Sequence, residues 1–266
     1  MRASRPSWTE ERGRSRVRLL STLLLLALAA CTVNEHSHEL ASNIQAAISP
    51  PQNARRFGSG TGFFIASDGT LMTARHVVED CLRIDVLSET IAPVSASVIV
   101  TSRNWDLALL RPTGTLSAPA VPLAIAVTPA RLAADLKAYG YPNTDARRAV
   151  AAELKLVNDR VPADAVTEPL RKSGYVLWVD GPLGHGYSGG PILDQEGDVV
   201  GLIRGSHETL RHFVATGTWP LIDLIANTEV KPRFTHELDD ADPDMRARRG
   251  IVRVVCWRAP AEQRVS

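Results

Sequence analysis

The sequence predicts an all-β protein made of two six-stranded-type β-barrels packed together, with one short closing helix. Short runs of apolar and β-branched residues, separated by Gly, Asp, Ser and Asn, begin at Gly58 and form two sets. A stretch rich in proline and alanine, residues 112–131, lies between the two sets and is expected to connect them. Apolar residues at helical spacing occur in the segment 219–227, which is expected to form the helix.

The N-terminal barrel is expected over residues 58–127. Its apolar runs are GTGFFIA, TLMTA, LRIDVLS, VSASVIVTS and DLALLRP. Short strands at this spacing, with turn residues between them, are typical of a β-barrel or a β-sandwich.

The C-terminal barrel, with the closing helix, is expected over residues 128–228. Its apolar runs are DLKAYGY, AVAAELKLV, YVLWVD, GPILD, DVVGLI and HFVAT. Residues 229–266 form a charged tail with one strand-like run, IVRVVCW. This tail is too short for a further domain of ordinary size, and the sequence leaves its role open.

The first 30 residues have the pattern of a secretory signal peptide. Several arginines precede the apolar run LLSTLLLLALAA, which ends in small residues. The run is shorter than the roughly 20 apolar residues that a membrane-spanning helix needs. Export is therefore expected, with an uncleaved signal anchor as the alternative.

The end of this run, Leu28-Ala29-Ala30-Cys31, resembles the bacterial lipobox. The resemblance implies that Cys31 becomes the first mature residue and carries lipid, so that the protein is a membrane-anchored lipoprotein of the bacterial cell envelope, facing the periplasm or the exterior. Ordinary signal cleavage beside an incidental cysteine is the alternative. Residues 31–57 are polar, contain Pro50-Pro51, and are expected to form a tether between the lipid and the first barrel.

Charge and cysteine content limit the partners. The net charge of +1 argues against a nucleic-acid-binding protein that relies on phosphate contacts. His36 and His38 are too few to fill a metal coordination shell, and no metal or organic cofactor is expected. Cys81 and Cys256 can pair after export, but the sequence leaves both this pairing and the oligomeric state open.

The segment GHGYSGGPI, residues 184–192, places Ser188 among four glycines. It is either a plain glycine turn or a nucleophile with unhindered backbone N–H groups beside it. A serine hydroxyl is a poor nucleophile unless a base activates it and an acid orients that base. The developing oxyanion also needs N–H donors aimed at it.

Two residues elsewhere in the chain meet these needs. His76 directly follows the apolar run TLMTA, at the start of a predicted helical turn, where a barrel edge can hold it rigidly. Asp106 begins the apolar run DLALLRP, and its neighbours Trp105 and Leu107 favour partial burial. A partly buried carboxylate needs a partner, which an imidazole can supply.

The blocks TARHVV, DLAL and GYSGGP, in this order, together resemble the trypsin-like serine peptidases. The resemblance is to the bacterial high-temperature-requirement (HtrA-like) branch, which has similar segments to GSGTGFFIASDGTLMTARHVV, AYGYP and GPILDQEGDVVGLI. It covers residues 58–227 and implies a chymotrypsin-like fold. It also implies a serine endopeptidase that forms an acyl-enzyme with a polypeptide substrate.

The resemblance assigns roles to individual residues. Ser188 corresponds to the nucleophile, His76 to the general base and acid, and Asp106 to the residue that orients His76. The backbone N–H groups of Gly186 and Ser188 correspond to the oxyanion hole. Substrate contacts are expected at Gly184, His185, Ile203, Arg204 and Gly205.

Three departures from the family pattern stand out. Tyr187 occupies a position where the family usually has Asp or Asn, so the oxyanion loop is expected to lack its usual polar brace. Arg75 precedes the histidine where a small residue is usual. The 39 residues after Asn227 are too few for a PDZ module, so gating through such a module is not expected.

Two other functions remain open. The residues GYSGG match the nucleophile elbow of α/β-hydrolase esterases, but that elbow leads into a helix, whereas PILDQEGDVVGLI predicts a hairpin. The second alternative is a peptidase-like fold that only binds peptides, which the unusual Tyr187 leaves open.

Overall fold

A computed structural model describes most of the chain after residue 53. The described residues are 54–131, 134–142, 148–157, 174–207, 212–234 and 242–260, and all belong to one compact unit, Pro50–Ser266. The predicted signal peptide, Cys31 and the tether up to residue 53 lie outside them. Within the described ranges, no helix has both the length and the apolar character needed to cross a membrane.

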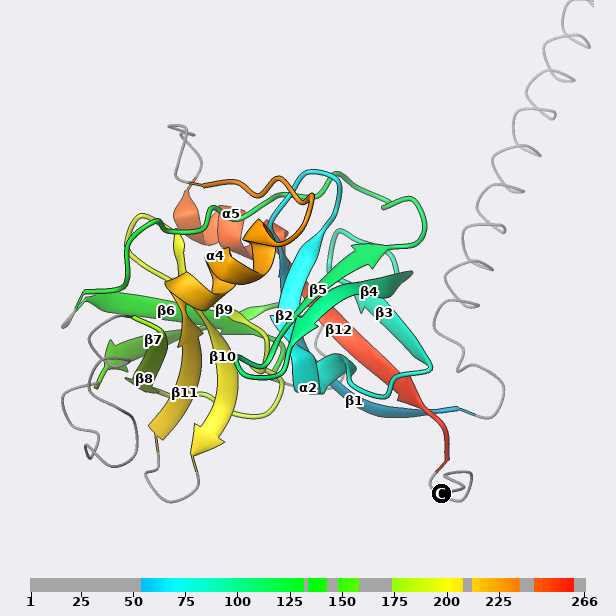
Figure 1. The fold of residues 1–266 in the computed structure, drawn as a ribbon, viewed down its shortest axis with the longest axis horizontal. Coiled ribbons are helices and arrows are strands. Elements are labelled where there is room, and N and C mark those ends of the chain that lie inside the picture. Colours follow the sequence, from blue (N-terminus) through cyan, green and yellow to red (C-terminus); the bar gives the residue numbers. More distant parts are fainter. Residues whose placement is uncertain are drawn as a thin grey trace, which may run out of the picture. The chain divides into compact units, whose positions relative to one another are not determined.

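The described chain forms two closed antiparallel barrels of six strands each, which confirms the predicted fold class (Figure 1). In the first barrel the strands follow the order β1-β12-β3-β4-β5-β2. Their bounds are β1 (Arg55–Phe64), β2 (Leu71–Ala74), β3 (Arg83–Leu87), β4 (Val94–Ser102), β5 (Leu107–Pro112) and β12 (Ile251–Arg258). A four-residue helix, α2 (Arg75–Val78), directly follows β2.

In the second barrel the strands follow the order β10-β11-β8-β7-β6-β9. Their bounds are β6 (Asp135–Gly140), β7 (Val150–Leu156), β8 (Val176–Asp180), β9 (Pro191–Leu193), β10 (Val199–His207) and β11 (His212–Gly217). The helix α4 (Thr218–Ala226) matches the closing helix expected over 219–227.

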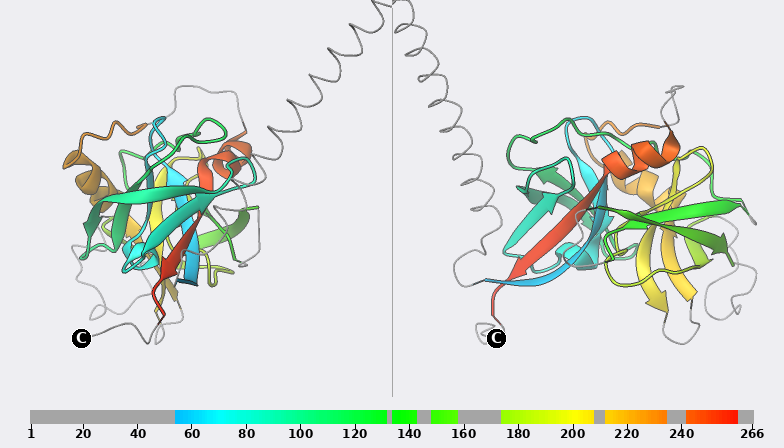
Figure 2. Two further views of the ribbon diagram at one scale, coloured as in Figure 1. Left: turned by 90° about the vertical axis from the view of Figure 1, so that its right-hand side faces the viewer. Right: turned by 180° about the vertical axis from the view of Figure 1, so that it is seen from behind.

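The C-terminal segment connects the two barrels, a role that the sequence left open. β12 pairs with β1 on one side and β3 on the other, so the end of the chain closes the first barrel (Figure 2). The preceding helix α5 (Pro243–Gly250) contacts the second barrel, where the Tyr139 hydroxyl donates to Asp244 at 2.5 Å. The first barrel therefore includes residues 251–258, and it begins at Arg55, within the segment 31–57 that was expected to be the tether.

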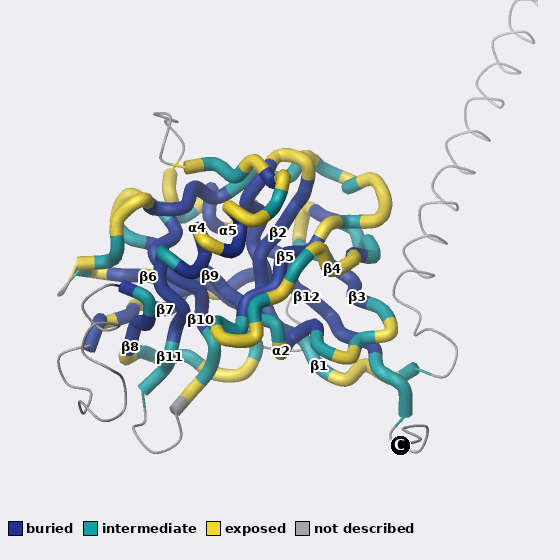
Figure 3. Tube along the Cα trace, viewed as in Figure 1, coloured by how far each residue is buried: buried dark blue, intermediate teal, exposed yellow. Residues whose placement is uncertain are grey.

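The strands around the junction of the barrels are almost completely buried (Figure 3). The fully buried residues include Phe63 and Phe64 in β1 and Leu107 and Leu109 in β5. Close-packed interiors of this kind deform little, so residues at the ends of these strands keep fixed positions.

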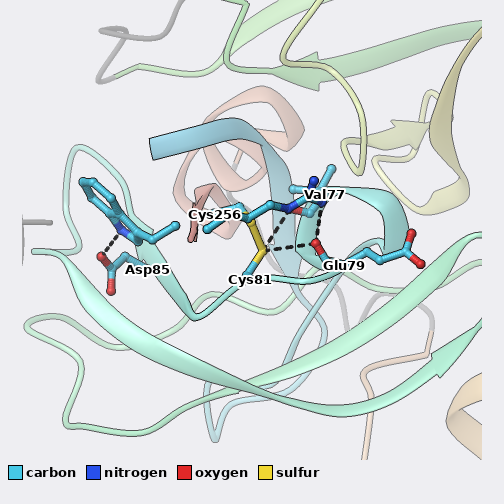
Figure 4. Close-up of a disulfide and its surroundings, with 7 residues drawn as sticks. Val77, Glu79, Cys81, Asp85 and Cys256 are labelled. Atoms are coloured by element: carbon cyan, nitrogen blue, oxygen red, sulfur yellow. Dashed lines mark hydrogen bonds between the residues drawn. A yellow bond between two sulfur atoms is a disulfide. The ribbon is translucent and has the colours of Figure 1, made fainter. Parts of the chain in front are cut away.

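Cys81 and Cys256 form a disulfide, which settles the pairing that the sequence left open (Figure 4). Their Cα atoms lie 5.4 Å apart, within the usual range for a disulfide. Cys81 Sγ lies 3.7 Å from the carbonyl oxygens of Val77 and Glu79, at the end of α2. The bond therefore joins the segment that follows His76 to the C-terminal strand.

Candidate active site

His76 lies on α2, and the start of this short helix is capped by Asp106, a residue of the turn between β4 and β5. Ala74 precedes the helix and supplies no side-chain cap. Instead, the backbone N–H of His76 donates to Asp106 Oδ1 at 3.0 Å, and the backbone N–H of Arg75 donates to the carbonyl oxygen of Asp106 at 3.0 Å. Asp106 thus satisfies N–H groups that a helix start leaves without intrahelical partners.

The side chains of His76 and Asp106 are joined directly. Nδ1 of His76 lies 2.7 Å from Asp106 Oδ2, and the carboxylate is 17% exposed against 46% for the imidazole. Because an ionised carboxylate only accepts hydrogen bonds, Nδ1 carries the proton. The other ring nitrogen, Nε2, is then an acceptor, which is the state that a general base requires.

The backbone of Asp106 is in the left-handed region, with φ of 53°. Residues 103–106 form the turn between β4 and β5, and Ser102 pairs with Leu107 across it. Aspartate tolerates this conformation better than most residues, although it costs an L-residue about 1–2 kcal/mol. Such a conformation persists where the surrounding contacts fix it, and three hydrogen bonds to Arg75 and His76 do so here.

Ser188 is the second residue of the second of two consecutive tight turns in the second barrel. The Tyr187 N–H donates to Gly184 O at 3.3 Å, and the Gly190 N–H donates to Tyr187 O at 2.8 Å. The third residues of these turns are glycines with φ of 96° at 186 and 83° at 189, as type II turns require. A Cβ on Gly186 would also overlap the carbonyl oxygen of Tyr141, so glycine is needed there on two counts.

The serine loop, residues 184–190, is fixed to the first barrel through Thr61 of β1. The fully buried Thr61 donates its backbone N–H to Ser188 O at 2.8 Å and its hydroxyl to Gly186 O at 2.6 Å. The same hydroxyl accepts from the Tyr141 N–H at 3.1 Å. Thr61 therefore contacts both residues whose N–H groups are the expected oxyanion donors.

The serine loop also lies against the strand that leads into His76. A Cβ on Gly189 would come within 2.8 Å of the backbone nitrogen of Ala74, two residues before the histidine. A Cβ on Gly60 would lie 2.7 Å from both Ser188 O and a methyl group of Val77. The structure thus brings the three sequence-predicted catalytic residues to one junction between the barrels.

The Ser188 hydroxyl has a different partner from the one expected of a nucleophile. Within the described residues, Oγ donates to the carbonyl oxygen of Arg204 in β10, at 3.3 Å, and not to His76. The loop itself is bound to β10 because the Gly189 N–H donates to Ile203 O at 2.8 Å and the Ile203 N–H donates to Gly190 O at 2.9 Å.

The two N–H groups predicted to bind the oxyanion have no hydrogen-bond acceptor among the described residues. In the part of the chain that the structure describes, the backbone N–H groups of Gly186 and Ser188 donate to no acceptor. Gly186 and Ser188 are both partly exposed, so their N–H groups are accessible from solvent. A ligand oxygen could accept from them.

Tyr187 stabilises the serine loop by packing, and the polar brace usual in the resembling family is absent from this position. Its side chain is 3% exposed and belongs to the core of the second barrel. The ring lies against Gly140, where an added Cβ would come within 2.6 Å of a ring carbon. Burial raises the pKa of the Tyr187 phenol above its ordinary value.

The residues expected to contact substrate differ in exposure. Gly184 and His185 are exposed, and Arg204 and Gly205 are partly exposed. Ile203 is 1% exposed and packs in the second-barrel core, so its side chain faces away from solvent. Among the described residues there is no group of three His, Cys, Asp or Glu side chains that could hold a metal ion.

Two further residues of the site cannot be recognised from the sequence. Thr61 resembles any threonine of a strand, and Trp105 indicates only an apolar neighbour of Asp106. Their contacts reach residues 125 and 111 positions away, to Gly186 and Thr216. Only the paired arrangement of the two barrels reveals them.

The two-barrel fold is that of the serine proteases of the trypsin type. The family model described as "Trypsin-like peptidase domain" matches residues 60–202, more than half of the chain. The chain belongs to this family and is a trypsin-like serine protease domain. The matched range includes His76, Asp106 and Ser188.

Several bacterial proteases are similar in sequence. The serine protease Rv3671c of Mycobacterium tuberculosis is 31% identical over 153 residues, which cover 55% of this chain and 36% of that protein. A probable periplasmic serine endoprotease DegP-like of Pseudomonas fluorescens is 28% identical over 155 residues, covering 54% of this chain and 28% of that protein. The chain thus spans about a third or less of the length of these relatives.

A solved structure shares the fold. The active form of the Rv3671c protease from M. tuberculosis superimposes with a TM-score of 0.52 at 23% identity, covering 68% of this chain and 82% of that chain. The two-barrel architecture is therefore that of a known serine protease.

Proposed function

We propose that the protein is a serine endopeptidase that cleaves polypeptides with His76, Asp106 and Ser188. The observation that carries this proposal is the His76–Asp106 pair, joined at 2.7 Å and additionally fixed through the His76 backbone N–H. The pair lies beside a serine loop in which the N–H groups of Gly186 and Ser188 have no acceptor among the described residues. Base, orienting acid, nucleophile and oxyanion donors are the four parts that acyl transfer through serine needs.

In the proposed cycle, Ser188 Oγ attacks the scissile carbonyl carbon while His76 Nε2 takes the hydroxyl proton. The carbonyl oxygen becomes an oxyanion that accepts from the N–H groups of Gly186 and Ser188. His76 then gives its proton to the leaving amine as the C–N bond breaks, and an acyl-enzyme remains. Water, deprotonated by His76, releases the acyl group and restores the Ser188 hydroxyl. Asp106 stabilises the imidazolium in both halves of the cycle.

The bond from Ser188 Oγ to Arg204 O suggests how substrate engages the site. A backbone N–H of a bound peptide can donate to the Arg204 carbonyl oxygen in place of the hydroxyl. The hydroxyl can then rotate to another staggered position and donate to His76. Main-chain recognition of this kind does not depend on side-chain sequence, which suits a polypeptide substrate that lies along Gly184–His185 and Arg204–Gly205.

We also propose that the protein acts in the bacterial cell envelope, with a lipid anchor at Cys31. The disulfide between Cys81 and Cys256 supports export, because such bonds persist in oxidising compartments. The DegP-like relatives are named as periplasmic endoproteases. The anchor itself rests on the sequence Leu28-Ala29-Ala30-Cys31, and Cys31→Ser should release the protein from the membrane fraction while leaving export intact.

The activity is tested by labelling the purified chain with a fluorescent fluorophosphonate, which reacts with activated serines. Wild type should label, and peptide mass mapping should place the adduct on Ser188. Ser188→Ala and His76→Ala should not label, although their thermal unfolding should match wild type. A folded wild-type protein that does not label, or an adduct on another serine, would contradict the proposal and favour a peptide-binding module.

A further inference from the structure

The turn that carries Asp106 makes its contacts with the other barrel through the preceding residue, Trp105. The Trp105 carbonyl oxygen accepts the hydroxyl of Thr216 in β11 at 2.6 Å, and Thr216 is fully buried. The Trp105 ring lies 5.4 Å from the ring of Tyr175, measured between centroids, with a tilt of 32°. Trp105 therefore lies in the first barrel by chain position and also contacts residues of the second barrel.

Trp105 packs against hydrophobic clusters on both sides of the junction. It contacts the large core that includes the first barrel, and it contacts the cluster formed by Val157, Val176 and Trp178 in the second barrel. Aromatic packing and a short hydrogen bond act together here, so the ring and the backbone of Trp105 are both fixed. The residue is partly buried and contacts both clusters, directly before Asp106 in the chain.

The contact with Thr216 leads by a short path to the serine loop. Thr216 pairs with Leu202 of β10, and the next residue, Ile203, exchanges hydrogen bonds with Gly189 and Gly190. The strand that binds the Trp105 carbonyl is thus the neighbour of the strand that binds the residues after Ser188. Any shift of Trp105 against β11 changes the position of Asp106 relative to Ser188.

Asp106 depends on this neighbour because its own backbone is in the left-handed region, with φ of 53°. The fully buried Leu107 fixes the side of Asp106 toward β5, and Trp105 fixes the other side. With one of these supports removed, the backbone can relax toward a more favourable conformation and move the carboxylate. The imidazole of His76 would follow, because its Nδ1 is bonded to that carboxylate.

We infer that Trp105 is a positioning residue, which aligns the His76–Asp106 pair with Ser188 by fixing the Asp106 turn to the second barrel. This inference rests on the proposed triad. It does not require Trp105 to touch the substrate. A residue of this kind should affect the chemical step and leave the Michaelis constant nearly unchanged.

The test is a double-mutant cycle on the full chain, with quenched fluorescent casein as the substrate. Trp105→Ala should lower kcat about 10- to 100-fold, the loss expected from a displacement of about 1 Å, with KM changed less than about threefold. Trp105→Phe should recover most of kcat, because it restores the aromatic contact. In an Asp106→Asn background, Trp105→Ala should cause almost no further loss, since residues that act as one unit are not additive.

A milder variant covers the case in which Trp105→Ala does not fold. Thr216→Val removes the hydrogen bond to the Trp105 carbonyl and keeps the side-chain volume, and it should lower kcat about threefold to tenfold by the same displacement. Trp257→Phe is the control, because this buried indole donates to Asp85 at 2.7 Å, a bond that includes neither Asp106 nor any residue bonded to it. It should lower the melting temperature and leave kcat at the wild-type value.

The outcomes separate this inference from the proposed function. If Asp106→Asn destroys turnover but Trp105→Ala and Thr216→Val leave kcat unchanged in folded protein, Trp105 has only a structural role and the inference is wrong. Equal losses from Trp105→Ala with and without Asp106→Asn would also overturn it. If Asp106→Asn itself retains turnover, the proposed triad fails, and the inference fails with it.

Discussion

The two halves of the candidate active site are built by different means. In the first barrel, one side chain makes the arrangement: Asp106 binds the backbone N–H and the Nδ1 of His76 at 3.0 and 2.7 Å. In the second barrel, backbone turns with glycines at 186 and 189 make the arrangement, and within the described ranges the N–H groups of Gly186 and Ser188 have no acceptor. The first half is joined before substrate is present, whereas the Ser188 hydroxyl still donates to Arg204.

The difference shows where each half obtains its rigidity. The serine loop of the second barrel is bonded to Thr61 of the first, and the aspartate turn of the first barrel is bonded to Thr216 of the second. Each barrel therefore fixes the functional segment of the other. The C-terminal segment, which contacts the second barrel through α5 and closes the first through β12, strengthens the same junction.

The largest expected effect is that of Asp106→Asn, which tests the half built by side-chain bonds. The asparagine oxygen would remain on the His76 backbone N–H, so its amide nitrogen would face Nδ1. Since an amide N–H₂ only donates, His76 would have to carry its proton on Nε2 and could no longer act as a base. We expect kcat for casein to fall about 10⁴-fold at pH 7, with the fold unchanged. A loss smaller than tenfold would show that Asp106 does not orient His76.

The next largest effect is expected for Gly186→Ala, which tests the half built by backbone turns. Alanine resists a φ of 96°, and its Cβ would overlap the carbonyl oxygen of Tyr141, so the turn should open and misdirect an oxyanion donor. Loss of one such donor lowers kcat about 10²- to 10³-fold. Gly58→Ala is the control, because nothing lies within 4 Å of its added Cβ. Equal activity of the two variants would show that the N–H of Gly186 does not contribute to the oxyanion hole.

A smaller effect is expected for Thr61→Val, which tests the link between the halves. The variant leaves Gly186 O and the Tyr141 N–H without their partner, and an unpaired buried polar group costs about 1–3 kcal/mol of stability. We also expect kcat to fall about tenfold, as the loop that binds the oxyanion loosens.

Thr218→Val is the matched control for this link. Thr218 is equally buried and donates its hydroxyl to Val200 O at 3.1 Å, a bond that includes no residue of the serine loop. Thermal unfolding should show similar losses for the two variants, and kinetics should show a lower kcat only for Thr61→Val. A similar loss of kcat in both would mean that Thr61 acts through general stability alone.

The fold and the site differ in how far the sequence predicts them. Local features are sufficient to predict the two barrels and α4, and they indicate His76 and Ser188 as candidates, because each depends on a short pattern of apolar runs, glycines and turn residues. The position of β12 was not predictable from such patterns. The run IVRVVCW indicates a strand, but its partners in β1 and β3 lie more than 160 positions earlier in the chain.

Tyr187 shows the same limit at the level of one side chain. The sequence indicates that the usual polar residue is replaced, and from this it predicts a loop without its brace. The structure shows that the ring packs against Gly140, a residue 47 positions away that has no side chain of its own. A tyrosine fits at position 187 because Gly140 leaves room for its ring, and the sequence around Tyr187 does not indicate this contact.

The smallest expected effect is that of Tyr187→Phe, which removes a hydroxyl and keeps the ring that stabilises the serine loop. Because the ring supplies the packing against Gly140, kcat should change less than about twofold, the level typical of substitutions away from critical contacts. Tyr187→Asn should instead lose about 3–5 kcal/mol, the cost of deleting a buried aromatic ring. Equal stability of the two variants in urea unfolding would show that the ring does not brace the loop.

Wild type and Tyr187→Phe should also differ in stability at alkaline pH. Burial raises the pKa of Tyr187, so the folded protein keeps this proton at a pH where tyrosine in the unfolded chain, with a pKa of about 10, loses it. The unfolded state then binds fewer protons, and the free energy of unfolding falls as the pH rises through this range. Tyr187→Phe lacks this contribution and should lose less stability than wild type between about pH 9 and pH 11. Urea unfolding at both pH values measures the difference, and parallel losses would mean that the phenol ionises freely in the folded protein.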